Sequence, residues 1–346
     1  MAGNKSQHYV PKMCMRLFAE RNDERVGIFV LDKAKFVPNA SIKGQFCKNY
    51  FYGRDGKAEQ AFGVIETRTA PILKRAANSN SLPSEGSAEF EQLILYLGLQ
   101  HCRTLSAAQA HEEASEKATK SLLRRKALLE GNQDILQALD SVLIKRTNAV
   151  AELVRYATIG ASLLRDLTFV IAVNKTAIDF VSSDAPVVLH NRLFEGQDIS
   201  VTGFANVGLQ LFLPLGPRAL LFGFDPAAYT VRVDRDGNVT LDTDADASLL
   251  NDLQWEAALS VILARSAANE AALQETWING GTTDHRSERC FAKRWSRIAA
   301  TKSEPATDRE RQLRESNSIF LLWKRRFPHR QSSASGTCPR SAMPSA

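Results

Sequence analysis

The amino-acid sequence predicts an α+β fold, in which a helical N-terminal half packs on a mostly antiparallel C-terminal sheet. Two observations predict this class. Residues 58–164 carry apolar side chains at helical spacing, whereas residues 167–241 carry short apolar runs separated by turn residues. Helices followed by strands, rather than helices and strands in alternation, are typical of α+β proteins.

The first sixty residues predict one short helix and a few strands. Residues 11–20 are expected to form the helix because Pro11 suits a first helical turn. Residues 26–31 are apolar enough for a buried strand, and residues 36–52 predict irregular or strand-like structure with several aromatic side chains.

Four helices are expected next, over residues 58–77, 85–103, 106–129 and 133–164. The second helix is apolar nearly all round (LILYLGL) and therefore predicts a buried central helix. The last two are charged along one side, which is typical of helices that cover a core.

The period of the pattern then changes to that of strands. Strands are predicted over residues 167–173, 178–181, 187–190, 209–214 and 219–224. Residues 229–233 and 239–241 flank an Arg-Asp-Gly-Asn turn and predict a hairpin. A final helix is expected over residues 246–268.

Residues 1–280 are predicted to form one domain, and residues 281–346 a basic, mostly disordered tail with a Ser/Pro-rich end. The tail holds 14 Lys/Arg and 6 Asp/Glu, whereas the rest of the chain holds 30 and 32. The net charge of +6 therefore comes entirely from the tail. A basic surface on the domain is not indicated, which leaves the tail as a candidate contact with nucleic acid.

The sequence also predicts a cytoplasmic protein. No apolar run approaches the roughly 20 residues of a membrane span, and the polar start lacks a secretory signal. The five cysteines are odd in number and have no C-x-x-C spacing, which argues against a disulfide framework or a zinc ribbon.

His8 and Asp184 are two candidate site residues. His8 precedes a predicted helix, where an imidazole can accept or donate a proton or bind a metal; the alternative is a hydrogen bond to a neighbouring carbonyl. Pro186 forces the residue before it to be extended, which places Asp184 at a sharp turn beside a strand end. An aspartate in such a turn more often caps its own backbone.

Glu66, Gln100 and Arg103 are the other candidates. Glu66 shares a helical stripe with Phe62 and Leu73, so it faces the core side and needs a partner, a hydrogen bond or a metal. Gln100 and Arg103 lie on one face at the end of the central helix. Two alternatives stay open: Arg103 neutralises Glu66, or it holds an anionic substrate such as phosphate.

Several common sites are not supported. His101, His111 and His190 lack metal-ligand spacing, and no G-x-G-x-x-G, Walker A or G-x-S-x-G string occurs. Dinucleotide-binding, P-loop and α/β-hydrolase proteins are therefore not indicated.

Taken in order, several strings resemble the bacterial family named domain of unknown function 4238. They are Gln7-His8-Tyr9-Val10-Pro11, Leu17-Phe18-Ala19, Phe51-Tyr52, Glu66, Leu99-Gln100-His101-Cys102-Arg103-Thr104, Ser183-Asp184-Ala185-Pro186-Val187, Leu213-Pro214-Leu215-Gly216-Pro217 and Asn251-Asp252-Leu253-Gln254. The resemblance spans roughly residues 8–268, with Ala185 where an Asn is usual. It implies a bacterial cytoplasmic protein with no settled activity.

Two function hypotheses follow. The first is a hydrolase acting on a phosphate-containing or nucleic-acid substrate, with His8, Glu66 and Asp184 as acid/base groups or as ligands of Mg²⁺ or Mn²⁺. Gln100 and Arg103 would position the anion, and the five side chains are expected to meet in one pocket. The second is a non-enzymatic binding or regulatory module whose basic tail contacts nucleic acid. The oligomeric state is left open.

Overall fold

The computed structural model describes residues 5–20, 24–145, 149–194, 202–266, 268 and 270–280 of the chain. Its largest sheet has five strands in the order β10 (Val239–Leu241), β5 (Thr168–Asn174), β9 (Ala219–Phe224), β8 (Gln210–Pro214) and β7 (Val188–His190). The β10–β5 pair is parallel and the other pairs are antiparallel.

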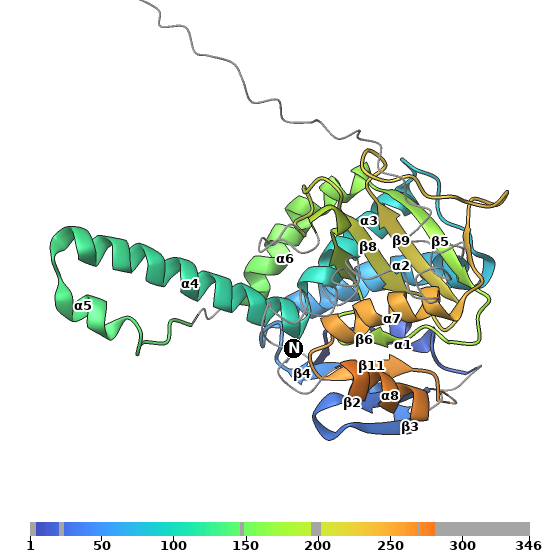
Figure 1. Cartoon of the computed structure of the whole chain (residues 1–346), viewed down its shortest axis with the longest axis horizontal. Helices are drawn as coiled ribbons and strands as arrows, with labels where there is room; N and C mark the ends of the chain where they lie inside the picture. Colours follow the sequence, from blue (N-terminus) through green and yellow to red (C-terminus); the bar gives the residue numbers. More distant parts are fainter. Residues whose placement is uncertain are drawn as a thin grey trace, which may run out of the picture.

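Helices lie on both faces of this sheet (Figure 1). They are α2 (Lys57–Ser79) and α3 (Ala88–Cys102) on one face and α7 (Asp244–Ala257) on the other. Because side chains alternate along a strand, Ile171 of β5 packs in the same core as Leu97 of α3. Its neighbour Ala172 packs in a second core with Leu250 of α7.

A second sheet brings together strands from both ends of the described chain. Its order is β3 (Lys35–Ser41), β2 (Arg25–Val30), β11 (Val261–Ala264) and β6 (Ser182–Ser183), all antiparallel. Phe29, Ile262 and Leu273 form its core with α8 (Glu270–Gly280). A separate pair, β1 (Ser6–His8) and β4 (Cys47–Asn49), holds the first strand.

The remaining helices are α1 (Lys12–Arg16), α4 (Leu105–Glu130), α5 (Gln133–Ala138) and α6 (Ala149–Gly160). Short 3-10 turns occur at Leu31–Lys33, Ile42–Gly44, Ala161–Asp166 and Arg192–Phe194. Most of α4, together with α5, projects from the body as an arm (Figure 1). No helix in the described part of the chain combines the length and the apolar character that a membrane span requires.

The predicted fold class is confirmed: helices dominate the N-terminal half, and the sheets of the C-terminal part are mostly antiparallel. The predicted hairpin is wrong, because Val239–Leu241 pairs in parallel with β5 and residues 229–233 form no strand. The aromatic residue of this segment, Tyr229, is buried in the core under α7 instead of lying in a strand. Its hydroxyl donates to the Gly208 carbonyl at 2.9 Å.

Three other elements differ from prediction. The helix expected over 246–268 ends at Ala257 and is followed by β11, and the helix expected over 133–164 contains two separate helices, α5 and α6. Residues 178–181 form no strand. Instead, the Val181 amide donates to Asn251 Oδ1 at 2.9 Å, so a side chain of α7 provides the hydrogen bond that a neighbouring strand would otherwise provide. The predicted tail, residues 281–346, lies outside the described residues, and the domain boundary near residue 280 stays a prediction.

Candidate functional site

The C-terminal end of α3 places Arg103 in the protein interior. Ser87 caps the start of α3 by accepting a hydrogen bond from the Phe90 amide at 3.1 Å, and the apolar run that follows buries the helix. Arg103 comes directly after the helix, and its amide donates to the Leu99 carbonyl at 3.0 Å. Its side chain is 2% exposed, so each guanidinium nitrogen needs a partner inside the protein.

Three side chains contact the Arg103 guanidinium. Nη1 forms an ion pair with Glu66 Oε1 at 2.9 Å, Nε donates to Gln100 Oε1 at 2.8 Å, and Cζ lies 4.7 Å from the centre of the Phe62 ring. Nη2 is buried and has no hydrogen-bond partner among the described residues. The Glu66 side chain is 28% exposed, so the cluster reaches the surface on the side of Glu66.

Two buried tyrosines, Tyr52 and Tyr96, lie close enough to Arg103 to interact with it electrostatically. Burial works against the charged form of Arg103, but the Glu66 carboxylate and, at high pH, the ionised tyrosines oppose this effect, and the pKa of Arg103 lies above its ordinary value. Burial also raises the pKa of the Tyr52 and Tyr96 hydroxyls. Near pH 7 the guanidinium is therefore charged and both hydroxyls are neutral hydrogen-bond donors.

The N-terminal segment joins the cluster through its backbone. Gln100 Nε2 donates to the Tyr9 carbonyl at 3.0 Å, and the Tyr52 hydroxyl donates to the His8 carbonyl at 3.2 Å. Gln7 Oε1 accepts from the Tyr52 amide at 2.7 Å, which fixes the loop that carries this tyrosine. Because Gln7 and Gln100 are fully buried, their amide hydrogen bonds hold the first strand at the end of α3.

The His8 ring has other neighbours. Burial, and then the charge of Lys12, lowers the pKa of His8, although the backbone of Lys43 and Ile42 opposes the shift. The ring is therefore neutral near pH 7. Its Nε2 is buried and has no hydrogen-bond partner among the described residues.

Asp184 binds the backbone of a distant segment. Its Oδ1 accepts from the Leu259 amide and its Oδ2 from the Ser260 amide, both at 2.8 Å. Burial raises the pKa of Asp184 to about 6, although these backbone amides oppose the shift. The carboxylate thus fixes the link between α7 and β11 and titrates close to neutral pH.

The structure joins Glu66, Gln100 and Arg103 by direct contacts. His8 is connected to this group indirectly, because its carbonyl accepts a hydrogen bond from the Tyr52 hydroxyl. Asp184 affects Tyr9 by its charge: burial, the larger cause, and this charge raise the pKa of the Tyr9 hydroxyl. The described residues contain no group of three or more His, Cys, Asp or Glu side chains placed to hold a metal ion. His8, Glu66 and Asp184 therefore do not form a metal site with one another.

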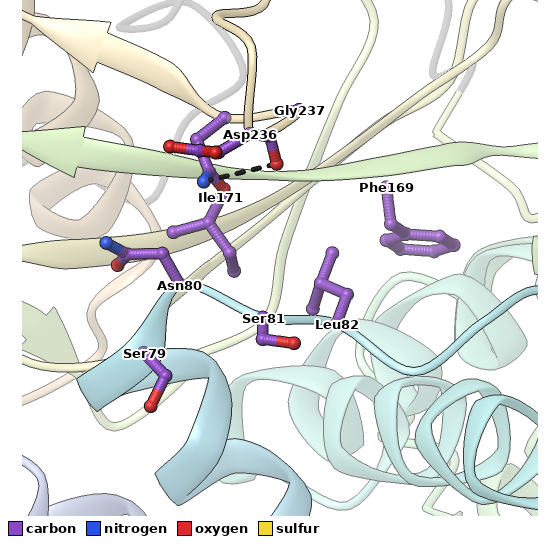
Figure 2. A pocket seen from close by; sticks show the side chains of 9 residues that line it. Ser79, Asn80, Ser81, Leu82, Phe169, Ile171, Asp236 and Gly237 are labelled. Carbon is purple, nitrogen blue, oxygen red and sulfur yellow. Dashed lines mark hydrogen bonds between the residues drawn. The ribbon is translucent and has the colours of Figure 1, made fainter.

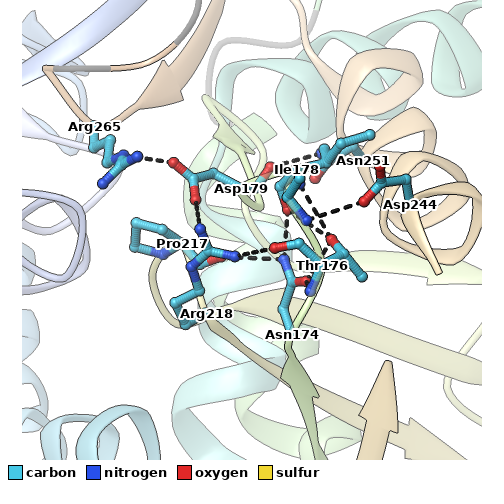
Figure 3. A network of polar contacts seen from close by, with 10 residues as sticks. Asn174, Thr176, Ile178, Asp179, Pro217, Arg218, Asp244, Asn251 and Arg265 are labelled. Atoms are coloured by element: carbon cyan, nitrogen blue, oxygen red, sulfur yellow. Dashed lines mark hydrogen bonds and ion pairs between the residues drawn. The ribbon is translucent and has the colours of Figure 1, made fainter. Parts of the chain in front are cut away.

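A second polar network joins the two sheets (Figure 3). Asp179 forms ion pairs with Arg218 at 2.6 Å and with Arg265 at 2.5 Å, and its carbonyl accepts from Asn251 Nδ2 at 2.9 Å. Arg218 precedes β9 in the large sheet, and Arg265 follows β11 in the other. The two arginines are half exposed, so these pairs position the sheets more than they stabilise them.

Sequence reasoning missed three members of the Arg103 cluster. Gln7 lies in a three-residue strand and Tyr52 in a turn, and neither segment is long enough for a periodic pattern to show which side chains turn inward. Phe62 had a usable signal, since it precedes Glu66 by one helical turn and any cation bound by Glu66 reaches its ring.

Comparison with known proteins identifies a family for this chain. The family described as "Protein of unknown function (DUF4238)" matches residues 6–268. The chain belongs to this family. No curated protein and no solved structure matches the DUF4238 chain. The strings around His8, Glu66, Gln100, Arg103 and Asp184 all fall within the matched residues.

Proposed function

We propose that this DUF4238 protein is a hydrolase that acts on a phosphate-containing substrate, nucleic acid included. The observation that carries the proposal is the Nη2 group of Arg103, which is buried beside Glu66 and has no acceptor among the residues that the structure describes. A buried donor left without a partner costs about 1–3 kcal/mol. Such a cost is commonly retained where a ligand completes the hydrogen bonds, and a guanidinium matches the oxygens of a phosphate.

Hydrolysis also needs groups that accept and donate protons. The neutral His8 imidazole has a nitrogen with no hydrogen-bond partner in the described part of the chain, and Glu66 is a partly exposed carboxylate beside the cation. Asp184, with a pKa of about 6, is a further acid/base candidate. In this proposal Arg103 and Gln100 position the phosphate, and His8 and Glu66 transfer the protons of water and leaving group.

The test is an activity assay with a matched charge control. The full chain is incubated with bis-(p-nitrophenyl) phosphate and with labelled DNA and RNA, in Mg²⁺, in Mn²⁺ and in EDTA. Glu66→Gln and His8→Gln are expected to lose activity by about 100-fold or more. Glu89→Gln removes the carboxylate of the exposed Arg75–Glu89 pair between the same two helices and is expected to keep full activity. Folded wild type without hydrolysis under all three conditions would refute the proposal.

The charge distribution supports a second candidate, a binding module whose tail contacts nucleic acid. The net positive charge of the chain comes from the tail, which includes Lys324, Arg325 and Arg326. Replacing these three residues by alanine in the full chain is expected to weaken DNA or RNA binding and to reduce its salt dependence. Unchanged binding would exclude the tail as the contact.

We also propose a cytoplasmic location. Cys14, Cys47 and Cys102 are free thiols, which suits a reducing compartment. Reaction of all three with a thiol reagent in freshly lysed, denatured cells tests this location.

A further inference from the structure

A cavity of about 510 Å³ lies apart from the Arg103 cluster, at the edge of the five-stranded sheet (Figure 2). The C-terminal end of α2 and the segment after it form one wall, with Ser79, Asn80, Ser81 and Leu82. Asp236, Gly237 and Asn238, in the loop before β10, form the opposite wall, and Phe169 and Ile171 of β5 form the floor. This volume is typical of a site for a small molecule.

The backbone of β5 is open along this floor. The edge strand β10 pairs only with Ala172–Asn174, so Thr168–Ile171 has no partner strand on that side among the described residues. Polar backbone groups at such an edge are free to bind a ligand. The cavity therefore offers directed hydrogen bonds as well as space.

The walls of the cavity are negative. Among the described residues that line it, Asp236 is the one charged side chain, and its carboxylate has no ion-pair partner in the described part of the chain. Asp234 fixes the loop that presents Asp236, because its Oδ1 accepts from the amides of Asp236 and Asn238, each at 2.9 Å. A phosphate or a carboxylate ligand would be repelled here.

The end of α2 adds to this negative potential. The helix ends at Ser79 with Asn80 in the left-handed conformation at φ 50°, and its last turn contains no basic side chain. The last carbonyls of a helix lack intrahelical donors and form the negative end of its dipole. Two negative features thus face each other across the floor that Phe169 and Ile171 form.

We propose that this cavity binds a small organic cation, with an ammonium or guanidinium group on a short aliphatic chain. The cation lies between Asp236 and the end of α2, and the aliphatic chain lies on the apolar floor. Ser79, Ser81 and Asn80 supply neutral hydrogen-bonding groups at the rim. The site is independent of the Arg103 cluster and takes a ligand of opposite charge.

Three ligands with the same four-carbon chain test the proposal by isothermal titration calorimetry: putrescine, 1,4-butanediol and succinate. We expect putrescine to bind the full chain at least tenfold more tightly than the other two, with an affinity that falls as salt is added. Asp236→Asn is expected to weaken putrescine binding about fivefold, which is the upper range for one exposed ion pair. Asp242→Asn, at the other end of β10 and also exposed, is the matched control and should bind as wild type does.

A second variant tests whether the ligand needs the space inside the cavity. Ser81→Trp fills the mouth of the cavity from an exposed position and is expected to abolish binding without loss of the fold. The proposal is overturned if putrescine does not bind at about 10 mM, the upper end of weak small-molecule affinities. It is also overturned if 1,4-butanediol binds equally well, or if Asp242→Asn weakens binding as much as Asp236→Asn does.

Discussion

Glu66 reaches Arg103 across the α2–α3 interface at 2.9 Å and so connects a half-buried carboxylate to a fully buried guanidinium. Removing the charge of Glu66 leaves the cation of Arg103 without its counter-ion in a poorly solvated place. The interface also holds Arg75 and Glu89, an exposed pair of the same kind. The two ion pairs differ in burial, so comparing their variants shows how burial changes the contribution of an ion pair to stability.

Glu66→Gln is expected to lower the free energy of unfolding by about 1–3 kcal/mol, which is the cost of one hydrogen bond to a charged group, reduced by partial exposure. Glu89→Gln should change it by less than about 1 kcal/mol. Urea denaturation at neutral pH measures both. Equal effects of the two variants would contradict a special role for the buried pair.

Gln100→Ala is expected to release the N-terminal segment. The change leaves the Tyr9 carbonyl and Arg103 Nε without their partner, at a cost of about 2–4 kcal/mol for two buried groups. Hydrogen exchange should become faster at the Tyr9 amide, which donates to the Phe46 carbonyl in the folded protein. Exchange that speeds up equally throughout the chain would indicate global loss of stability instead.

Asp184→Asn should change how stability depends on pH. The pKa of Asp184 is about 6 when folded and 3.8 ordinarily, so the folded state binds an additional proton between these values. Its contribution is therefore fully present below about pH 4 and is lost as the pH rises to about 6, by up to about 3 kcal/mol. Urea denaturation from pH 4 to 7 should show this decline in wild type and not in Asp184→Asn. Asp242→Asn, which alters an exposed carboxylate, should keep it.

His8 should contribute with the opposite sign. Its pKa is lowered by folding, so the unfolded state takes up the proton first and the stabilising contribution is lost as the pH falls below about 6.5. The NMR titration of the His8 ring should have a midpoint below that of an unfolded peptide. A midpoint at or above 6.5 would show that the ring is more solvated than the structure places it.

Two glycines in helices should respond oppositely to alanine. A Cβ at Gly98 would lie 2.7 Å from Ala161 Cβ, so Gly98→Ala forces α3 away from the neighbouring turn and should destabilise the protein by about 1–3 kcal/mol. At Gly63 of α2, no atom of the described residues lies within 4 Å of the same position. Gly63→Ala should stabilise by about 0.5–1 kcal/mol because alanine favours the helix. Thermal unfolding of the two variants measures both signs.

The periodic elements were predictable because their signal is local. The helix expected over residues 58–77 is α2, Lys57–Ser79, and the stripe that placed Glu66 toward the core also leads to Arg103. β11 was not predictable, since its four apolar residues fit a helix equally well and its strand form depends on β2 and β6. Asp184 accepts hydrogen bonds from two backbone amides about 75 residues further along the chain, and no sequence pattern predicts a hydrogen bond to a backbone group so distant.

The pairing of β2 with β11 means that this part of the second sheet can form only late in protein synthesis. β2 is made early, but its partner from Val261 to Ala264 leaves the ribosome only after almost all other described elements. Contacts so distant in sequence form late and slow folding. Until then the nascent chain carries β2 with the backbone groups of one edge unpaired, and chains stopped before residue 261 should aggregate through this edge rather than fold.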